Sequence, residues 1–519
     1  MIRKNSATSL LYKKNITIFN IIMKRTILIL ITSLLFACNT TENKLPNILL
    51  ITVDDMNFDT PGSFGGDKNI TPNIDRLATQ GMRFMRAHVP VAICQVSRQS
   101  LITGRYPHNA GFRWFDPVAP GVPLLTELLH KEGYINACFG KADHLQPRER
   151  YIWNESLDLK EIDGGREPAK YFELCKSFIE KAKKGNAPFF LMANSHDPHR
   201  PFHKDDDEQK LLNQLSNKNV KFADPSRVYR ADEAIDLGFM PSIPEVKKQT
   251  VQYMNSCRRA DDTVGEVLRA LKESGEWDNT VIVFLSDNGS HFPFAKGNVY
   301  LNATRTPFIV CWEGHIKAGS INKKDFINGI DFMPTILDIV GLTSPKKMDG
   351  RTFLPLLKGE KQEERNSTVT AYYNVYPVVP ERKPEMMEWF EMRCLHQGEY
   401  GYIYNSWADG NTRFSSGGRP KILKEMKLMG HTERLHMFEY RQPEEFYQFD
   451  SDPDALNNLI DSLQFKGKIQ EMRVELFDWM KKYNDTDLLP EFQVVAEQKG
   501  FNENVPRGKG YKNIKPVTK

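Results

Sequence analysis

The sequence predicts an α/β protein in which helices sandwich a large mixed, mostly parallel sheet, followed by a smaller α+β subdomain. Two observations predict this class. Continuous apolar runs alternate with amphipathic segments until about residue 370, and short aromatic-rich runs dominate after that point. A chain of 519 residues is long enough to give each part its own core. The net charge of +4 is spread along the chain and gives no indication of a nucleic-acid partner.

Four apolar runs of the first part end in polar side chains. Uninterrupted apolar runs are typical of parallel strands that are buried on both faces. Because ligands of open parallel sheets bind beyond the carboxyl ends of the strands, we expect the polar side chains to converge at one edge. The runs span residues 47–55, 135–141, 187–199 and 280–289, and their polar ends are Asp54-Asp55, Lys141, His196 and Asp287-Asn288.

Helices are predicted between these strands. Residues 71–81 begin with Thr71 as a candidate cap and Pro72 in the first turn, and Gly81 is a stop signal. Residues 124–134 form a second amphipathic segment. Both segments fit the alternation of strand and helix that a mostly parallel sheet requires.

The smaller part begins where the composition changes. Residues 400–406 indicate an antiparallel strand, and residues 468–483 have helical periodicity. We therefore expect a larger α/β domain over residues 45–370 and a C-terminal subdomain with an antiparallel sheet and a helix over 371–490; the family resemblance given below implies that the larger domain is the catalytic one. A loosely held tail is expected over 491–519.

The N-terminal segment resembles an export signal. Lys24 and Arg25 precede a short apolar run, and Cys38 follows a small residue at the end of that run. The pattern is similar to a bacterial lipoprotein signal with Cys38 as the lipid-bearing residue; the alternative is an ordinary signal peptide with a chance cysteine. We expect residues 1–38 to be this segment and Met23 to be the true start. The protein would then be exported to the cell envelope, as an outer-membrane lipoprotein that faces the periplasm or the cell surface and contacts the membrane through its lipid anchor.

The acidic ends of two predicted strands point to a metal ion. Asp54, Asp55 and Asp287 supply carboxylates and Asn288 supplies an amide oxygen, which are hard ligands for Ca²⁺ or Mg²⁺. Either pair alone is more often part of a solvated loop. Directly after apolar strands, however, carboxylates need a cation or cationic partners.

Several cationic side chains suggest that the ligand is an anion. A metal with fixed cations around it suits a tetrahedral oxyanion, sulfate or phosphate. Any one of these side chains alone would more often lie on a solvated face. The cations in question are Arg98, Lys141, Lys296 and Arg305.

Histidines and one cysteine could carry the chemistry. His144 and His196 can transfer protons near neutral pH, and His199 and His203 lie in the same run as His196. Cys94 stands four residues before Arg98, so it is either a buried core thiol or a nucleophile held by basic neighbours. The six cysteines that follow Cys38 form no CxxC pair and no metal-finger pattern.

An ordered series of motifs resembles the formylglycine-dependent sulfatases of the alkaline phosphatase superfamily. Residues 94–105, "CQVSRQSLITGR", are similar to the family signature, in which a cysteine or serine is followed by x-P/A-S-R and then T-G-R; Val96 stands at the P/A position. Further similar motifs follow in family order over residues 46–460: "LLITVDD", "TPNIDRLA", "FGKADH", "SHDPH", "SDNG", "KGNVYLNATRTP" and "FYQFDSDPDALNNL".

The resemblance implies a sulfuric ester hydrolase with an alkaline phosphatase-like fold. It implies that a maturation enzyme oxidises Cys94 to formylglycine, whose hydrate attacks sulfur, displaces the alcohol and then releases sulfate as the aldehyde re-forms. It also implies one Ca²⁺ per site, held by Asp54, Asp55, Asp287, Asn288 and the modified Cys94. The implied catalytic residues are Cys94, Arg98, Lys141, His144, His196 and Lys296.

The same resemblance implies distinct roles for these residues. Arg98 and Lys141 would hold the nucleophile and the developing charge, and Lys296 would grip the sulfate. His196 would protonate the leaving oxygen, and His144 would help expel sulfate from the covalent intermediate.

The resemblance also suggests a class of substrate. "SHDPHRP" and "SDNGSHFPFAKGNVY" are most similar to the heparan N-sulfatase (sulfamidase) branch. For an exported bacterial enzyme we expect O-sulfate esters on a polysaccharide or its oligosaccharides, such as algal ulvan, fucan or galactan or a glycosaminoglycan. The candidates for binding the hydroxyl or carboxylate groups of the sugar are Arg200, His203, His291, Arg393 and His396.

Three alternatives stay open at this point. An N-sulfoglucosamine hydrolase would cleave a sulfamate instead of an ester. A phosphomonoester or phosphonate hydrolase of the same superfamily would share the metal and the sheet. A glycan-binding lipoprotein would keep the anchor and would not need a converted Cys94.

Overall fold

The computed structural model describes residues 23, 44–67, 69–208, 210, 222–373, 375–376, 388–411, 413–414 and 420–489. The chain from Pro46 onward forms one compact unit. The predictions of lipidation at Cys38 and of a tail over 491–519 lie outside the described residues. Within the described part of the chain, no helix has the length and apolar character needed to cross a bilayer.

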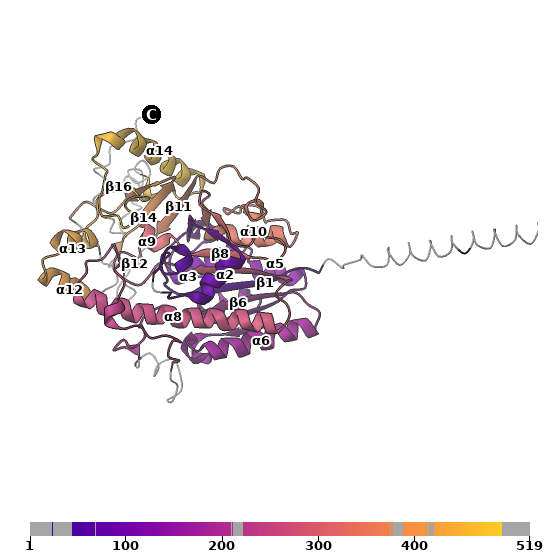
Figure 1. The fold of residues 1–519 in the computed structure, drawn as a ribbon. Helices are drawn as coiled ribbons and strands as arrows, with labels where there is room; N and C mark the ends of the chain where they lie inside the picture. Colours follow the sequence, from indigo (N-terminus) through magenta and orange to yellow (C-terminus); the bar gives the residue numbers. More distant parts are fainter. Residues whose placement is uncertain are drawn as a thin grey trace, which may run out of the picture. The chain divides into compact units, whose positions relative to one another are not determined.

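A sheet of eight strands forms the centre of this unit (Figure 1). Four neighbouring strands in it are parallel, and they are the four apolar runs of the sequence. Their side chains are buried almost throughout, as expected for strands covered on both faces. In sheet order they are β4 (Ile135–Phe139), β6 (Phe189–Asn194), β1 (Asn47–Val53) and β7 (Thr280–Ser286).

Shorter strands extend the sheet at both edges. β5 (Glu155–Leu157) pairs in parallel with β4. On the other side, β8 (Phe308–Cys311) runs antiparallel to β7, and β2 (Met82–Phe84) runs antiparallel to β8. β9 (Ser320–Asn322) then pairs in parallel with β2. The predicted mixed, mostly parallel sheet is confirmed.

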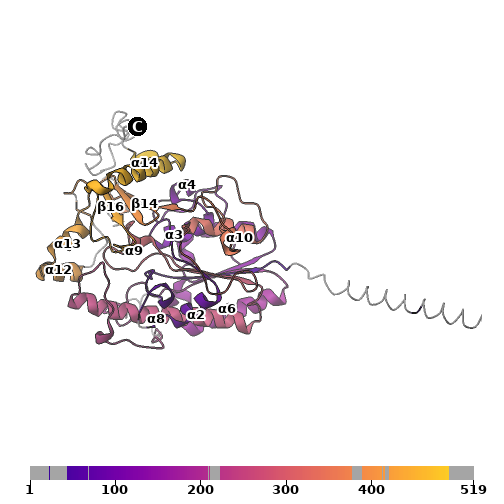
Figure 2. The same ribbon diagram turned by 45° about the horizontal axis from the view of Figure 1, so that its top comes forward.

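Helices cover both faces of this sheet, as Figures 1 and 2 show. The segments predicted over 71–81 and 124–134 are both helical, although each is shorter than expected. The helices on one face are α2 (Pro72–Gln80), α6 (Pro168–Lys184) and α8 (Pro244–Glu273), and those on the other are α3 (Cys94–Thr103), α5 (Leu125–Lys131) and α10 (Phe332–Ile339).

The start of α2 corrects one detail of the sequence analysis. Thr71 is the N-cap residue, but its side chain makes no capping hydrogen bond. Asp261 of α8 replaces it and accepts the backbone N–H groups of Asn73 at 3.0 Å and Ile74 at 2.8 Å. Burial raises the pKa of Asp261 to about 7. The cap was mispredicted because its acceptor comes from a helix far along the chain.

A second, antiparallel sheet and a helix form the predicted C-terminal subdomain. The helix α14 (Lys466–Lys482) packs on the sheet through a buried cluster that includes Tyr402 and Met472. The first strand begins at Ser367, slightly before the expected boundary at residue 371. In sheet order the strands are β11 (Ser367–Tyr372), β14 (Met392–Gln397), β15 (Tyr400–Asn405) and β16 (Glu444–Gln448).

Short elements connect these layers. Two strand pairs lie outside the main sheets, one parallel and one antiparallel. The connecting elements are β3 (Ala87–His88), β10 (Ile327–Asn328), β12 (Val375–Tyr376), β13 (Glu388–Trp389), α4 (Pro107–Ala110), α9 (Leu301–Thr304), α11 (Leu354–Leu357), α12 (Pro420–Leu428) and α13 (Thr432–Glu439).

Candidate active site

The polar ends of the four parallel strands meet at one edge of the sheet. Lys141 follows β4, His196 follows β6, and Asp54 follows β1. Lys141 forms an ion pair with Asp54, and His196 Nδ1 lies 3.1 Å from Asp54 Oδ2. Because the strands are parallel neighbours, their carboxyl ends bring together side chains as far apart in sequence as Asp54 and His196, which 142 positions separate.

Three buried carboxylates form the centre of the site. Ligand atoms of Asp54, Asp55, Asp287 and Cys94 all lie within 4.8 Å of one another. Burial and the nearby charge of Asp54 raise the pKa of Asp287 well above its usual value. Burial has the same tendency at Asp54, but Lys141, Asp287, His196 and His199 together outweigh it and lower the pKa of Asp54 well below its usual value. Carboxylates packed this closely need positive charge to stay ionised.

Three oxygens of this cluster fit a metal ion. Among the described residues, no hydrogen-bond donor reaches Asp54 Oδ1, Asp55 Oδ2 or Asn288 Oδ1, although all three atoms are buried. The amide nitrogen of Asn288 donates to Asp55 Oδ1 at 2.7 Å, which fixes the orientation of both side chains. Buried oxygens without donors, supplied by carboxylates and an amide, are the donor set that a hard cation such as Ca²⁺ prefers.

Arg98 ties the helix α3 to the strands. Its guanidinium donates to Asp287 Oδ2 at 2.8 and 3.1 Å, and to Thr52 Oγ1 at 2.6 Å and Asn194 Oδ1 at 2.7 Å. Only 1% of its side chain is exposed. Burial opposes the charge, but Asp287 and Asp54 prevail and raise the pKa of Arg98. Arg98 stands one helical turn after Cys94, so one face of α3 presents both side chains to the site.

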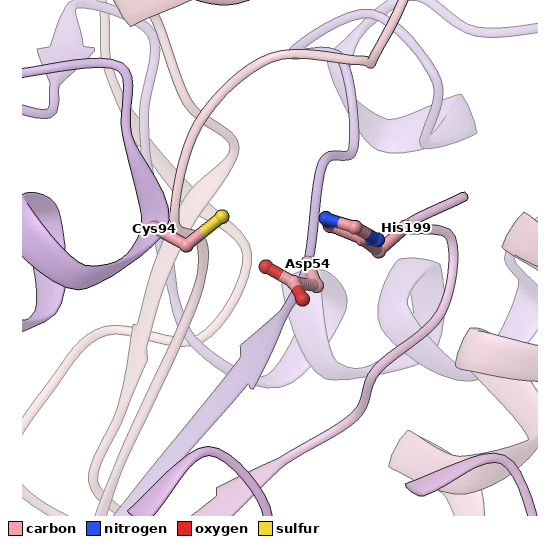
Figure 3. A group of neighbouring side chains, drawn as sticks. All are labelled: Asp54, Cys94 and His199. Atoms are coloured by element: carbon pink, nitrogen blue, oxygen red, sulfur yellow. The ribbon is translucent and has the colours of Figure 1, made fainter. Parts of the chain in front are cut away.

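Cys94 is the first residue of α3, and its thiol faces charged groups (Figure 3). Its Sγ lies 3.1 Å from Lys296 Nζ and 3.8 Å from Asp55 Oδ1, and Lys296 also forms an ion pair with Asp55. Burial and the charge of Asp54 nevertheless raise the pKa of the thiol well above its usual value. The residue is buried in a polar site instead of an apolar core, and it is poorly suited to act as a thiolate.

A row of histidines borders the carboxylates. The rings of His196 and His199 are stacked 4.8 Å apart, and the ring of His291 lies 5.6 Å from that of His199. His199 Nε2 and His291 Nδ1 lie 3.8 and 3.6 Å from Asp55 Oδ2. Burial lowers the pKa of His199 to about 4. Figure 3 shows the His199 ring directed toward Asp54, so the second histidine of the "HDPH" run reaches the site.

His144 lies at the rim beside an exposed aromatic side chain. Its ring is 6.3 Å from that of Phe115, which is 50% exposed. Burial and the charge of Lys141 lower the pKa of His144 well below its usual value. The loop with Phe115 is tethered to α3, because Gln99 donates to the carbonyl of Asp116 at 3.1 Å. Phe115 was not identified from the sequence.

Two of the residues predicted to bind the sugar contact nearby carboxylates instead. Arg200 Nη1 lies 3.5 Å from Asp205 Oδ2, and its side chain is 17% exposed. His203 Nε2 lies 2.9 Å from Asp224 Oδ1.

Two more of the five candidates, Arg393 and His396, lie in the C-terminal sheet, and the fifth, His291, borders the carboxylates as described above. Arg393 is fully buried on β14, forms an ion pair with Asp485 and stacks over Tyr373. His396 is also buried on β14, with its ring 4.2 Å from that of His88. The Arg393 guanidinium is therefore already neutralised within the subdomain.

The fold and this site define the class of protein. Buried carboxylates, a metal-type oxygen set and fixed cations at the carboxyl edge of a parallel sheet characterise a hydrolase for esters of a tetrahedral oxyanion. Residues 46–342 match the family model described as "Sulfatase". The chain belongs to the sulfatase family, whose members are sulfuric ester hydrolases.

Curated relatives agree with this assignment. An ulvan-active sulfatase of Formosa agariphila is 27% identical over 443 residues, which cover 85% of this chain and 81% of the relative. Human N-sulphoglucosamine sulphohydrolase is 25% identical over 474 residues, with 85% and 90% covered.

Solved structures share the fold. A protein solved in complex with its substrate D-glucosamine-2-N,6-O-disulfate is similar with a TM-score of 0.60 at 20% identity, and 86% of this chain and 99% of that chain are covered. A phosphonate monoester hydrolase of Agrobacterium radiobacter is similar with a TM-score of 0.63 at 17% identity, with 84% and 96% covered. The predicted alkaline phosphatase-like fold is confirmed.

Proposed function

We propose that Cys94 is converted to formylglycine and that the enzyme removes sulfate groups, chiefly O-sulfate esters, from a sulfated polysaccharide or its oligosaccharides. The observation that carries this proposal is the environment of the thiol. Cys94 Sγ lies beside Lys296 and Asp55, in the position of a nucleophile, yet its pKa is raised by burial and by Asp54. A hydrated aldehyde at this carbon would offer two hydroxyl groups, one to attack sulfur and one to expel the sulfate.

The residues of the site support a defined sequence of bond changes. One hydroxyl of the hydrate attacks sulfur, the S–O bond to the sugar breaks, and His196 gives its proton to the leaving sugar oxygen. The second hydroxyl loses its proton with the help of His144, the bond between the formylglycine carbon and the sulfate oxygen breaks, and the aldehyde re-forms. Water then restores the hydrate. A bound sulfate ester brings negative charge, which favours the protonated form of His196 that this step requires.

The cations have a binding and orienting role in this proposal. Lys296 reaches both Cys94 and Asp55, so it can hold a sulfate oxygen next to the nucleophile. Arg98 and Lys141 fix Asp287 and Asp54 and hold them near the reacting groups. Their fixed positive charge stabilises the negative charge that develops on the oxygens around sulfur.

We assign a calcium site to Asp54, Asp55, Asp287 and Asn288, with the modified Cys94 as a further ligand. The buried oxygens without donors support this assignment. A calcium ion bound there would lower the pKa of the nucleophilic hydroxyl and polarise the sulfate oxygens. We keep the predicted division into a catalytic domain over 45–370 and a C-terminal subdomain over 371–490 as a proposal, with the first strand of the subdomain, β11, starting at Ser367.

A saccharide substrate is supported by the relatives and by the rim of the site. The names of the similar proteins refer to ulvan and to N-sulphoglucosamine. Phe115 is 50% exposed next to His144, and an exposed aromatic ring gives an apolar face for the C–H surface of a sugar. We further propose export, a lipid anchor at Cys38, and a formylglycine-generating enzyme as maturation partner.

A sulfamate substrate is the second candidate, because the human relative is named for it. The likeness to a phosphonate monoester hydrolase concerns the fold alone. Both alternatives leave Cys94 and the acidic cluster in place, so substrate turnover has to decide between them.

The proposal is tested by sulfate release. Purified protein from a host with maturation enzymes is incubated with ulvan, carrageenan, fucoidan, heparan sulfate and N-sulfoglucosamine, and free sulfate is measured by ion chromatography. We expect release from at least one O-sulfated saccharide, and none with Cys94→Ala. Faster hydrolysis of phosphonate esters than of every sulfated compound would contradict the proposal.

A further inference from the structure

A second cavity lies between the catalytic part and the C-terminal sheet. It measures about 420 Å³ and is lined by residues around β3, by Arg305 just after α9, by His396 of β14 and by Phe449 just after β16. None of the residues to which the proposed function gives a role as nucleophile, metal ligand or sulfate-binding cation lines it. It is therefore separate from the catalytic centre. Two residues singled out in the sequence for anion or sugar binding, Arg305 and His396, meet here although 91 positions separate them.

Arg305 is a cation in need of an acceptor. Its Nε is buried and, within the described part of the chain, has no hydrogen-bond partner. The guanidinium lies over the ring of Phe58, 3.9 Å from the centroid. Burial lowers its pKa to about 10, although Asp59, Asp450 and Asp454 act in the opposite direction from a distance. A guanidinium placed in this way is stabilised when an anion reaches its donors.

His396 brings a second unpartnered nitrogen to the same cavity. Only 2% of the residue is exposed, and its Nε2 pairs with Thr370 Oγ1 at 3.1 Å. Its buried Nδ1 has no hydrogen-bond partner among the described residues. An unpartnered polar atom at this depth is costly unless a ligand or water occupies the cavity beside it.

The rest of the lining adds positive charge and flat apolar surface. Arg86 and Lys323 are cationic, and Asp450 is the acidic side chain of the lining. Asp450 lies 3.2 Å from Arg86 and is 58% exposed, so it pairs with Arg86 at the rim. Within the described part of the chain, no carboxylate forms an ion pair with Arg305. Four aromatic side chains also contribute: Phe58, Phe326, Tyr400 and Phe449.

We infer that this cavity is a second, non-catalytic site that binds an oxyanion group, a sulfate or a carboxylate, through Arg305 and His396. A single sulfate would leave most of 420 Å³ empty, so the cavity has room for the sugar ring that carries such a group. The oxyanion bound here could be inorganic sulfate released by catalysis or the acidic group of a sugar in the polymer. The relative affinities for sulfate and for glucuronate distinguish these two ligands. The inference stands whether or not the proposed substrate is correct.

The test uses sodium sulfate and D-glucuronate as probes in isothermal titration calorimetry of the full chain. We compare the wild type with Arg305→Met and with the control variant Arg227→Met. Arg227 also lies over an aromatic ring, 4.5 Å from the centroid of Tyr229, but its side chain is 44% exposed and forms an ion pair with Glu233. We expect Arg305→Met to weaken one sulfate site at least tenfold and Arg227→Met to leave it unchanged. Glucuronate binding at the Arg305-dependent site with higher affinity than sulfate assigns the site to acidic sugars, and the reverse order assigns it to the released ion.

His396→Leu is the second variant, because it removes the Nδ1 donor and leaves Arg305 in place. We expect it to weaken the same site. Crystals soaked in selenate give the location directly, through an anomalous peak between Arg305 Nε and His396 Nδ1. Identical sulfate isotherms for the wild type, Arg305→Met and His396→Leu, or the absence of a selenate peak in this cavity, would overturn the inference.

Discussion

Removal of the Arg98 charge tests how the buried acids are held. In Arg98→Met, the two hydrogen bonds to Asp287 and the bonds to Thr52 and Asn194 are lost. Thr52 still donates to Asn194 at 2.7 Å, so the main cost is the loss of positive charge beside the buried acids Asp54 and Asp287, neither of which is exposed. Loss of one partner of a buried ion pair costs about 3–5 kcal/mol. Against a total stability of about 5–15 kcal/mol, the variant should fold but unfold at clearly lower urea concentration.

The assay is urea unfolding in EDTA, so that no bound metal compensates for the missing charge. Asp287→Asn is introduced alone and together with Arg98→Met. Because the amide at position 287 takes one ionisable acid out of the cluster that Arg98 neutralises, we expect the double variant to be about 1–3 kcal/mol more stable than the sum of the single effects predicts. A cost below about 1 kcal/mol for Arg98→Met, or purely additive effects, would refute the view that Arg98 holds the acidic cluster together.

Three further predictions follow from the geometry. His196→Gln should lower kcat for alkyl sulfates by about 10²–10⁴-fold and lower kcat for an aryl sulfate less, because an aryl oxygen leaves without protonation. Steady-state kinetics on both substrates checks this prediction, and equal losses of kcat would argue against His196 as the proton donor. Dialysis against EDTA should lower the midpoint of thermal unfolding. Calcium added at about 100 times its Kd should raise the free energy of unfolding by about 2.7 kcal/mol, and Asp54→Asn should make this stabilisation by calcium smaller. Burial lowers the pKa of His396 to about 3, whereas a histidine in the unfolded chain has a pKa of about 6.5. As the pH falls below about 6.5, the unfolded state therefore takes up the proton first, and the free energy of unfolding decreases by about 1.4 kcal/mol per pH unit. The variant His396→Gln should reduce this slope in unfolding measurements between about pH 4.5 and 6.

The convergence of the acids and cations could be predicted from the sequence. Uninterrupted apolar runs identified β1, β4, β6 and β7, and parallel pairing fixes which end of each strand faces the ligand. A residue that follows such a strand is thus placed without knowledge of any contact. This reasoning located the carboxylates, Lys141 and His196 together.

Contacts made by distant helices and loops could not be predicted in this way. The cap of α2 by Asp261 and the support of Arg98 by Asn194 depend on how separate elements pack, which periodicity does not encode. The same limit applies to the surroundings of Arg393 and His396, which could not be predicted from the sequence. Their residue types suggested sugar contacts; the structure buries both on β14, where Arg393 pairs with Asp485 and His396 lines the cavity beside Arg305.

The most direct test of the proposed mechanism is the mass of the tryptic peptide of residues 87–98, which contains Cys94. Conversion of the thiol to formylglycine lowers its mass by about 18 Da. We predict this loss in protein from a host that converts a control sulfatase, and a larger converted fraction in Val96→Pro, which restores the usual residue of the motif. An unmodified thiol in both proteins would contradict the formylglycine mechanism.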